Sequence, residues 1–224
     1  MRVIIFGASG MVGQGALREC LRDPQVSEVL SIGRSALAQS HAKLNQLTLP
    51  DLSDLSAVEA QLAGYDACFF CLGVSSAGMN EARYRTLTYD LTLAAGRPLA
   101  RLNPAMTFIY VSGVGTDSSE RGRSMWARVK GATENALLAL PFHAVMFRPG
   151  AIVPLHGIRS RTRVYDLLYR LLKPLWFGAL RLFPNQVTTT ERVGLAMLAV
   201  ARHETTLRIV EPGEINRLAL PSAE

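Results

Sequence analysis

The stretch MRVIIFGASGMVG, residues 1–13, places a short apolar run directly before three evenly spaced glycines. The β-branched run Val3–Phe6 predicts a buried strand, and the apolar spacing that begins inside the glycine cluster predicts a helix. In such a strand–turn–helix block Gly7 allows a tight turn, and Gly13 lets the helix pack close to the strand. Gly10 leaves room for a pyrophosphate to approach the backbone, so the stretch predicts a nucleotide-binding turn.

The predicted turn leads into a helix N-terminus, which is a favourable place for a phosphate group. Unpaired N–H groups and the positive end of the helix dipole stabilise an anion there by about 0.3 to 2 kcal/mol. The alternative is a glycine-rich turn without a ligand, but the flanking strand and helix favour the nucleotide. The residues expected to contact the cofactor here are Gly7, Ser9, Gly10, Met11, Val12 and Gly13.

Length and composition favour one globular domain. The chain has 224 residues, of which 49% are hydrophobic and 19% charged, so a single α/β domain can bury a full core. We expect one dinucleotide-binding domain over residues 1–224, with a small substrate or lid lobe at residues 151–224 within it. The formal net charge of +6 suits an anionic ligand. The basic residues are scattered, which argues against nucleic acid as a partner.

The N-terminus and the cysteines indicate the compartment. The N-terminal apolar run is four residues long and ends in glycine, unlike a signal peptide, so we expect a cytoplasmic protein. Cys20, Cys68 and Cys71 are an odd number, which argues against a disulfide framework. Cys68 and Cys71 lie three apart in a predicted strand and face opposite sides of the sheet, so we expect no metal site.

Predicted strands and helices alternate along most of the chain. Strands are expected at residues 28–32, 44–49, 65–73, 106–111, 143–148 and 207–211, and helices at 55–62, 81–95, 125–139 and 191–202. This order predicts an α/β fold of the Rossmann type, a doubly wound parallel sheet with right-handed crossovers.

Arg34 indicates which dinucleotide binds. It follows the strand at residues 28–32, about twenty residues after the last fingerprint glycine, where an NAD site carries Asp or Glu. Arginine suits a 2′-phosphate through charge-assisted, bidentate contacts, so Arg34 and Ser35 predict NADP, with NAD less favoured. The alternative is an exposed arginine on a loop.

The chain resembles the short-chain dehydrogenase/reductase superfamily in its extended and atypical branches. Within it, the chain looks like the Tat-interacting-protein group and like bacterial proteins described as nucleoside-diphosphate-sugar epimerases. The resemblance rests on the glycine spacing and on four further sites: Cys71-Leu72-Gly73, Ser112, Val129-Lys130-Gly131 and Phe147-Arg148-Pro149-Gly150.

The resemblance implies roles for several residues. Ser112 would hydrogen-bond the substrate oxygen, and Lys130 would hold the nicotinamide ribose. Asp51 and Leu52 would meet the adenine, although Asp51 or Ser53 equally suits a helix cap. Further cofactor contacts are expected from Cys71, Leu72 and Gly73, and from the backbone of Pro149, Gly150, Ala151 and Ile152.

The chain departs from the superfamily pattern at Trp126. Four residues before Lys130 these enzymes carry a tyrosine, which acts as a general acid/base because the neighbouring lysine lowers its pKa. An indole N–H donates a hydrogen bond but does not ionise near neutral pH. Trp126 could orient a carbonyl without supplying a proton, or it could pack over the cofactor pocket as an apolar side chain.

Residues 159–183 form a predicted amphipathic helix with Pro174 inside it. We expect its wide apolar face to cover the substrate cleft or to form a homodimer contact, and we do not expect it to bind a membrane.

Two functions suit these residues. The first is an NADP-dependent oxidoreductase or epimerase-like enzyme acting on an unknown small molecule. The alternative is a non-catalytic NADP(H)-binding module that controls a protein partner.

Overall fold

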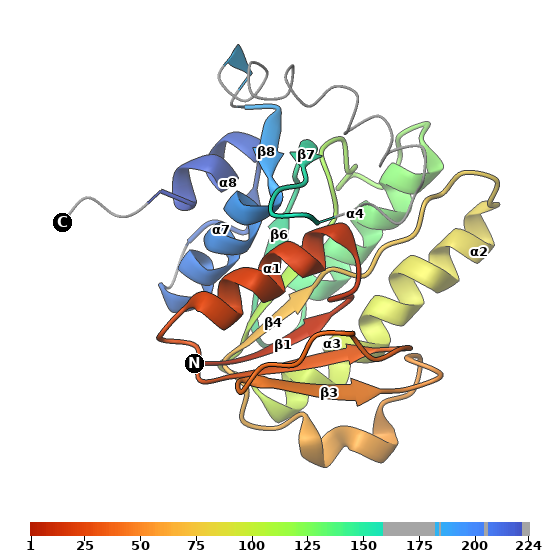
Figure 1. Cartoon of the computed structure of the whole chain (residues 1–224). Helices are drawn as coiled ribbons and strands as arrows, with labels where there is room; N and C mark the ends of the chain where they lie inside the picture. The colour runs from red at the N-terminus through yellow and green to blue at the C-terminus, as the bar shows by residue number, and fades with distance from the viewer. Residues whose placement is uncertain (159–181, 184, 204–205, 221–224) are drawn as a thin grey trace.

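A seven-stranded parallel sheet forms the centre of the protein (Figure 1). The computed structural model describes residues 1–158, 182–183, 185–203 and 206–220. The strands lie in the order β3-β2-β1-β4-β5-β6-β9, and every neighbouring pair is parallel. Their bounds are β1 Arg2–Phe6, β2 Glu28–Gly33, β3 Leu44–Thr48, β4 Ala67–Phe70, β5 Thr107–Val111, β6 His143–Phe147 and β9 Ile209–Val210. The order reverses between β1 and β4, so the predicted Rossmann-type fold is confirmed.

Helices cover both faces of the sheet, with α1 in front and α3 and α4 behind in Figure 1. The alternation of side chains in β1 explains the two layers: Val3 and Ile5 pack into one core cluster, and Ile4 and Phe6 into the other. The first cluster includes residues of α1 (Met11–Arg22), α7 (Thr190–Arg202) and α8 (Pro212–Leu218). The second includes residues of η1 (Ser56–Gln61), α3 (Leu91–Leu102) and α4 (Met125–Leu138).

Two predicted helices differ from the structure. The helix expected at residues 55–62 is the short 3₁₀ helix Ser56–Gln61, in which only Val58 is buried, so there is little apolar area to support a longer α-helix. The helix expected at residues 81–95 runs on to Leu102, as α2 (Glu81–Arg85), the π-helix η2 (Thr86–Asp90) and α3. Gly96 and Pro98 weaken a helix, but its last turn is supported by Leu99 and Ala100, which are buried in the core.

A small parallel pair, β7 (Ala151–Val153) and β8 (Val187–Thr189), was not predicted. Each strand has only three residues, too few for a periodic signal. Thr189 caps α7, because its Oγ1 accepts a hydrogen bond of 3.0 Å from the Arg192 N–H.

Cys68 and Cys71 pack on opposite faces of the sheet, as predicted. Cys68 belongs to the core cluster beneath α3 and α4, whereas Cys71 contacts the cluster beneath α1 and α7. Burial raises the pKa of Cys71 to about 12 and raises that of Cys68 as well, so both thiols stay protonated at neutral pH. Among the residues that the structure describes, no group of three or more His, Cys, Asp or Glu is placed to hold a metal ion.

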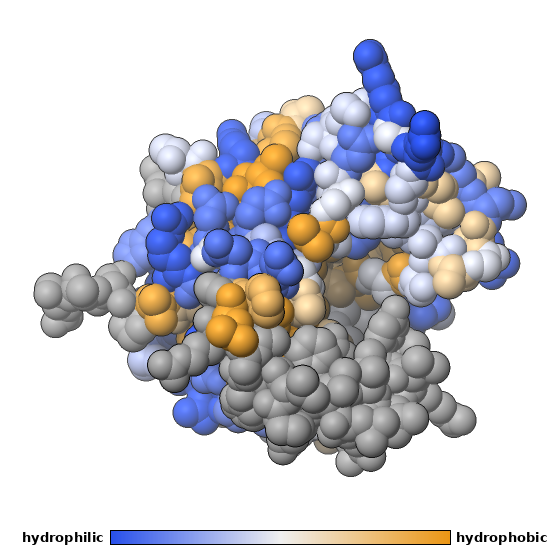
Figure 2. Space-filling view, turned by 90° about the horizontal axis from the view of Figure 1, so that it is seen from above, coloured by the Kyte–Doolittle hydropathy of each residue, from blue (hydrophilic) through white to orange (hydrophobic). Residues whose placement is uncertain are grey.

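Hydrophobic residues form separate patches among hydrophilic ones when the described surface is seen from above (Figure 2). The exposed large hydrophobic residues are Val74, Leu87, Val114, Leu182, Phe183 and Leu220. In the described ranges, no helix combines the length and hydropathy needed to cross a membrane. The predicted helix at residues 159–183 lies outside the described residues, except for Leu182 and Phe183.

Candidate functional site

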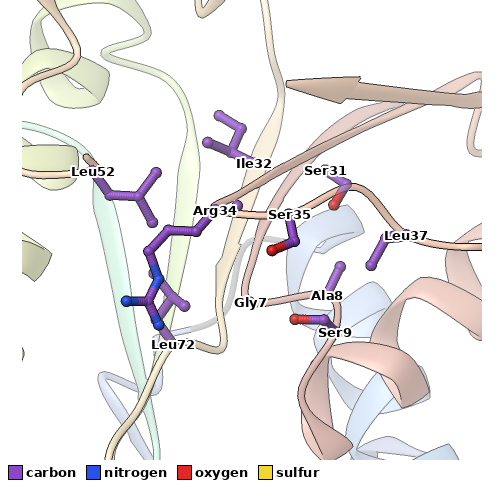
Figure 3. Close-up of a pocket in the computed structure, with 11 residues that line it drawn as sticks. Gly7, Ala8, Ser9, Ser31, Ile32, Arg34, Ser35, Leu37, Leu52 and Leu72 are labelled. Atoms are coloured by element: carbon purple, nitrogen blue, oxygen red, sulfur yellow. The ribbon is translucent and has the colours of Figure 1, made fainter. Parts of the chain in front are cut away.

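A cavity of about 250 Å³ opens where β1, β2 and β4 end. In open α/β sheets a ligand binds at the point where the strand order reverses, and this cavity lies there. It is shown in Figure 3, where Arg34 lies on one side and the Ser9 and Ser35 hydroxyls face the space between. The cavity is lined by Gly7, Ala8, Ser9, Ser31, Ile32, Gly33, Arg34, Ser35, Leu37, Leu52 and Leu72. A neighbouring cavity of about 510 Å³ shares Ala8, Ser9 and Leu37 with it.

The turn between β1 and α1 fits a pyrophosphate. Gly7 has a positive φ of 78°, and a Cβ there would lie 2.9 Å from the backbone of Cys71 and Leu72. A Cβ on Gly13 would lie 2.2 Å from the Gly7 carbonyl oxygen, so both glycines are required by the fold itself. Gly10 has an ordinary φ of −82°, and no side chain caps α1 there. The N-terminus of α1 is therefore available to an anion.

We predict that Gly13→Ala lowers the free energy of unfolding by about 1 to 3 kcal/mol, because the added methyl meets backbone instead of a movable side chain. Urea denaturation measures the change. Gly73→Ala is the control, since nothing lies within 4 Å of a Cβ at Gly73. Equal stability of the two variants would contradict the close packing of α1 on the turn.

Arg34 is exposed, and among the described residues it makes no hydrogen bond or ion pair. None of the residues that line the cavity is acidic. A cationic side chain without a carboxylate beside it is what a 2′-phosphate requires.

The structure brings together part of the predicted cofactor set. Gly7, Ser9, Arg34, Ser35, Leu52 and Leu72 line one cavity, and Gly10, Met11, Val12 and Gly13 lie at the start of α1. Asp51 does not line it; its carboxylate accepts a 2.8 Å hydrogen bond from the Ser53 N–H in the following turn. It does not cap η1 either, because the Asp54 carboxylate accepts from the Ser56 N–H at the start of that helix. Sequence reasoning missed the contributions of Ala8, Ser31, Ile32, Gly33 and Leu37 to the cavity.

A second group of predicted residues lies at the ends of β5 and β6. Lys130 Nζ donates a hydrogen bond to the Ser112 carbonyl oxygen. The Val114 N–H donates to the Pro149 carbonyl oxygen at 3.0 Å, which joins the loops after β5 and β6. Ile152 is buried in β7. Ala151 pairs with Val187, and a Cβ on Gly150 would lie 2.1 Å from the Gln186 carbonyl oxygen, so both residues also hold β7 beside β8.

Glu134 is a residue of this group that sequence reasoning missed. It is fully buried, accepts a 2.5 Å hydrogen bond from Ser112 Oγ, and forms a bidentate ion pair with Arg148. Its spacing, one helical turn after Lys130, places it on the same face of α4, but nothing in the sequence indicated its partners Ser112 and Arg148. The hydrogen bond to Glu134 raises the pKa of the Arg148 guanidinium above its usual value.

Burial lowers the pKa of Lys130 from 10.5 to about 8, although the Glu134 charge acts in the opposite direction. The unfolded chain therefore binds more protons than the folded protein between about pH 8 and 10.5, and stability rises with pH across that window. We predict a gain of about 1 kcal/mol, since Lys130 keeps some contact with solvent. Urea denaturation at pH 7.5 and pH 10 measures it against Lys130→Met, in which the gain should vanish. An equal pH dependence in both proteins would contradict the lowered pKa.

Trp126 lies in the first turn of α4 beside the loop that follows β5. Its ring atom Cη2 is 3.4 Å from the position of a Cβ on Gly115, so the indole packs against this loop. It is partly exposed, on the helix that also carries Lys130 and Glu134. An indole at this position has no ionisable phenol.

Comparisons with known proteins agree with this architecture. The chain is 29% identical to protein HTATIP2 of Rattus norvegicus over 155 residues, which cover 67% of this chain and 62% of the rat protein. It is 25% identical over 158 residues to the mitochondrial protein FMP52 of Candida albicans, with 68% of each chain covered. The resemblance to the Tat-interacting-protein group is confirmed. No protein-family model matches the chain.

The fold is also similar to that of a solved enzyme. The crystal structure of Bordetella bronchiseptica WbmF in complex with NAD+ aligns with a TM-score of 0.64 and 16% identity, covering 96% of this chain and 76% of that one. At this level of identity the likeness concerns the fold.

The expected cytoplasmic localisation is contradicted by the relatives. The FMP52 proteins of Candida albicans and of three other fungi are named mitochondrial. The expectation rested on the absence of a secretory leader, a criterion that does not test for import into an organelle.

Proposed function

We propose that this protein binds NADP(H) in the cavity at the β1/β4 switch point. The observation that carries the proposal is the lining of that cavity, which places Arg34, Ser9 and Ser35 around a space without a carboxylate. An NAD site needs a carboxylate for the ribose hydroxyls, whereas a 2′-phosphate needs a cation and hydroxyl donors.

The chain offers groups for each part of the cofactor. The N-terminus of α1 would hold the pyrophosphate, and Arg34 and Ser35 the 2′-phosphate. Lys130 would hold the nicotinamide ribose, and the backbone of residues 149–152 would border the nicotinamide. When bound, this cofactor supplies or accepts a hydride. The neighbouring residues Ser112, Trp126 and Lys130 orient the reacting groups and exclude water.

We propose an oxidoreductase or epimerase-like activity on a small molecule at the end of the site near Ser112. Trp126 favours the alternative, a non-catalytic module in which NADP(H) occupancy controls a protein partner, because an indole cannot exchange the proton that carbonyl reduction needs. Single-turnover oxidation of NADPH over a panel of carbonyl compounds separates the two.

The first experiment is to identify a copurified dinucleotide. Denaturing the purified protein and measuring the mass of the released ligand should give NADP+ or NADPH. Isothermal calorimetry on the ligand-free protein should then show tighter binding of NADP(H) than of NAD(H). Equal affinities, or no binding of either at millimolar concentration, would reject the proposal.

Self-association through residues 159–183 is a further part of the proposal, supported by the wide apolar face of that sequence. Light scattering should detect a dimer that Leu175→Glu weakens. Stable flotation with anionic liposomes, lost in the same variant, would show that this face binds lipid instead.

A further inference from the structure

The Ser112 hydroxyl has only acceptors within hydrogen-bonding distance among the described residues. Its oxygen lies 2.5 Å from Glu134 Oε1 and 3.2 Å from the carbonyl oxygen of Phe147. A serine hydroxyl carries one hydrogen and two lone pairs. Its single hydrogen is shared between these two acceptors, so Ser112 Oγ has only lone pairs to offer to a further group.

The Glu134 carboxylate is fixed in this position by Arg148. The guanidinium donates to both carboxylate oxygens, with Nε 3.0 Å from Oε1. Arg148 is itself held by Ser118 Oγ at 2.5 Å and lies 3.5 Å from Glu211 Oε1. Glu134 is fully buried and the Arg148 side chain is 12% exposed. A bidentate pair in such surroundings has a rigid geometry and leaves Glu134 no freedom to turn from Ser112.

Ser112 also lies beside the groups assigned to the nicotinamide end of the cofactor. Its carbonyl oxygen accepts from Lys130 Nζ, and its N–H donates to the Phe147 carbonyl oxygen at 2.9 Å, two residues before Pro149. A group of the cofactor that meets Ser112 Oγ must therefore carry an N–H or O–H. The carboxamide of the nicotinamide is the part of that ring with N–H donors.

We propose that Glu134, clamped by Arg148, is a positioning residue that makes Ser112 accept a hydrogen bond from the nicotinamide carboxamide rather than donate one to a substrate carbonyl. This inference rests on the proposed function, since it requires the dinucleotide in the site. It gives Ser112 a role different from the one that the superfamily resemblance implies. Trp126 stands in the tyrosine position and cannot supply a proton. Neither Ser112 nor Trp126 would then donate a hydroxyl proton to a substrate carbonyl.

The test compares NADP+ with its 3-acetylpyridine analogue, in which a methyl group replaces the carboxamide NH2. Calorimetry should show that the native protein binds NADP+ about 3- to 10-fold more tightly, the value of one hydrogen bond. Ser112→Ala should bring this ratio close to one. Ser118→Ala is the matched control, since Ser118 contacts Arg148 but not Ser112, and the bidentate Arg148–Glu134 pair remains in this variant, so the ratio should be kept. A ratio near one in the native protein, or an unchanged ratio in Ser112→Ala, would overturn the inference.

Glu134→Leu tests the positioning role directly. It removes the carboxylate that holds the Ser112 hydrogen, so the ratio should fall while NADP+ still binds. A simple loss of stability would weaken both dinucleotides alike and leave the ratio unchanged, which would count against the positioning role. If this variant does not fold, the Ser112→Ala and Ser118→Ala comparison decides.

A second measurement separates this inference from the proposed function. In the protein without dinucleotide, the Ser112 hydroxyl hydrogen should give a slowly exchanging, downfield proton resonance that is lost in Ser112→Ala and kept in Ser118→Ala. Its absence would overturn the inference whether or not NADP+ binds. Its presence in a protein that binds neither dinucleotide would reject the proposed function and the carboxamide contact, while leaving the Ser112–Glu134 hydrogen bond established.

Discussion

Replacing Arg34 with alanine is expected to weaken NADP(H) binding by about 10- to 150-fold, which corresponds to the loss of a charge-assisted contact worth about 1.5 to 3 kcal/mol. Binding of NAD(H) should change by less than about twofold, because the lost guanidinium faces a phosphate that NAD lacks. The large effect follows from the structure around Arg34, which has no ion pair in the described part of the chain and no acidic neighbour in the cavity. Calorimetry with both dinucleotides measures the two affinities.

Arg101→Ala is the control for this experiment. Arg101 is also exposed, but it pairs with Glu59 on η1, outside the cavity, so its loss changes the net charge equally without touching the site. An equal loss of NADP(H) affinity in Arg101→Ala would show a general effect of charge. An unchanged preference in Arg34→Ala would remove the basis for NADP over NAD.

The parts of the fold that the sequence predicts well are those set by local pattern. The run Val3–Phe6 and the glycines after it give the first strand, the turn and α1, because a buried strand and a tight turn each need particular residues at particular spacings. The element from Glu81 to Leu102 was predicted too short for a reason of packing. Gly96 and Pro98 weaken a helix in isolation, and only the burial of Leu99 and Ala100 in the core shows why the helix continues.

Some residues of the candidate site could likewise be predicted from local pattern, and others could not. Ser9 and Arg34 could be assigned from spacing along the chain, because the turn after β1 and the loop after β2 meet in every fold of this type. Glu134 could not, since its partner Ser112 lies 22 residues earlier and Arg148 lies 14 residues later. The role of a buried carboxylate on a helix can be recognised only when the fold places both of its partners against it.

Trp126→Tyr is expected to raise the rate of carbonyl reduction by about 10² to 10⁴, the usual contribution of a general acid. The phenol would stand one helical turn before Lys130 on α4, close enough for the ammonium to lower its pKa. The indole of Trp126 packs against the loop at Gly115, and a smaller tyrosine ring fits that space without forcing the backbone to move. NADP(H) affinity should therefore stay within about threefold of the native value, which is a change of less than about 1 kcal/mol in binding free energy.

The decisive measurement is single-turnover oxidation of NADPH by the native protein and by Trp126→Tyr over a panel of ketones and quinones. Trp126→Phe is the control, since it makes the same reduction in size without an ionisable group. A gain in Trp126→Tyr that is absent from Trp126→Phe would show that the site needs only a proton donor to become a reductase. Fast oxidation by the native protein would instead mean that another group supplies the proton. Because Ser112 gives its hydrogen to Glu134, the candidates would then be Lys130 and an ordered water, and Lys130→Met would distinguish them.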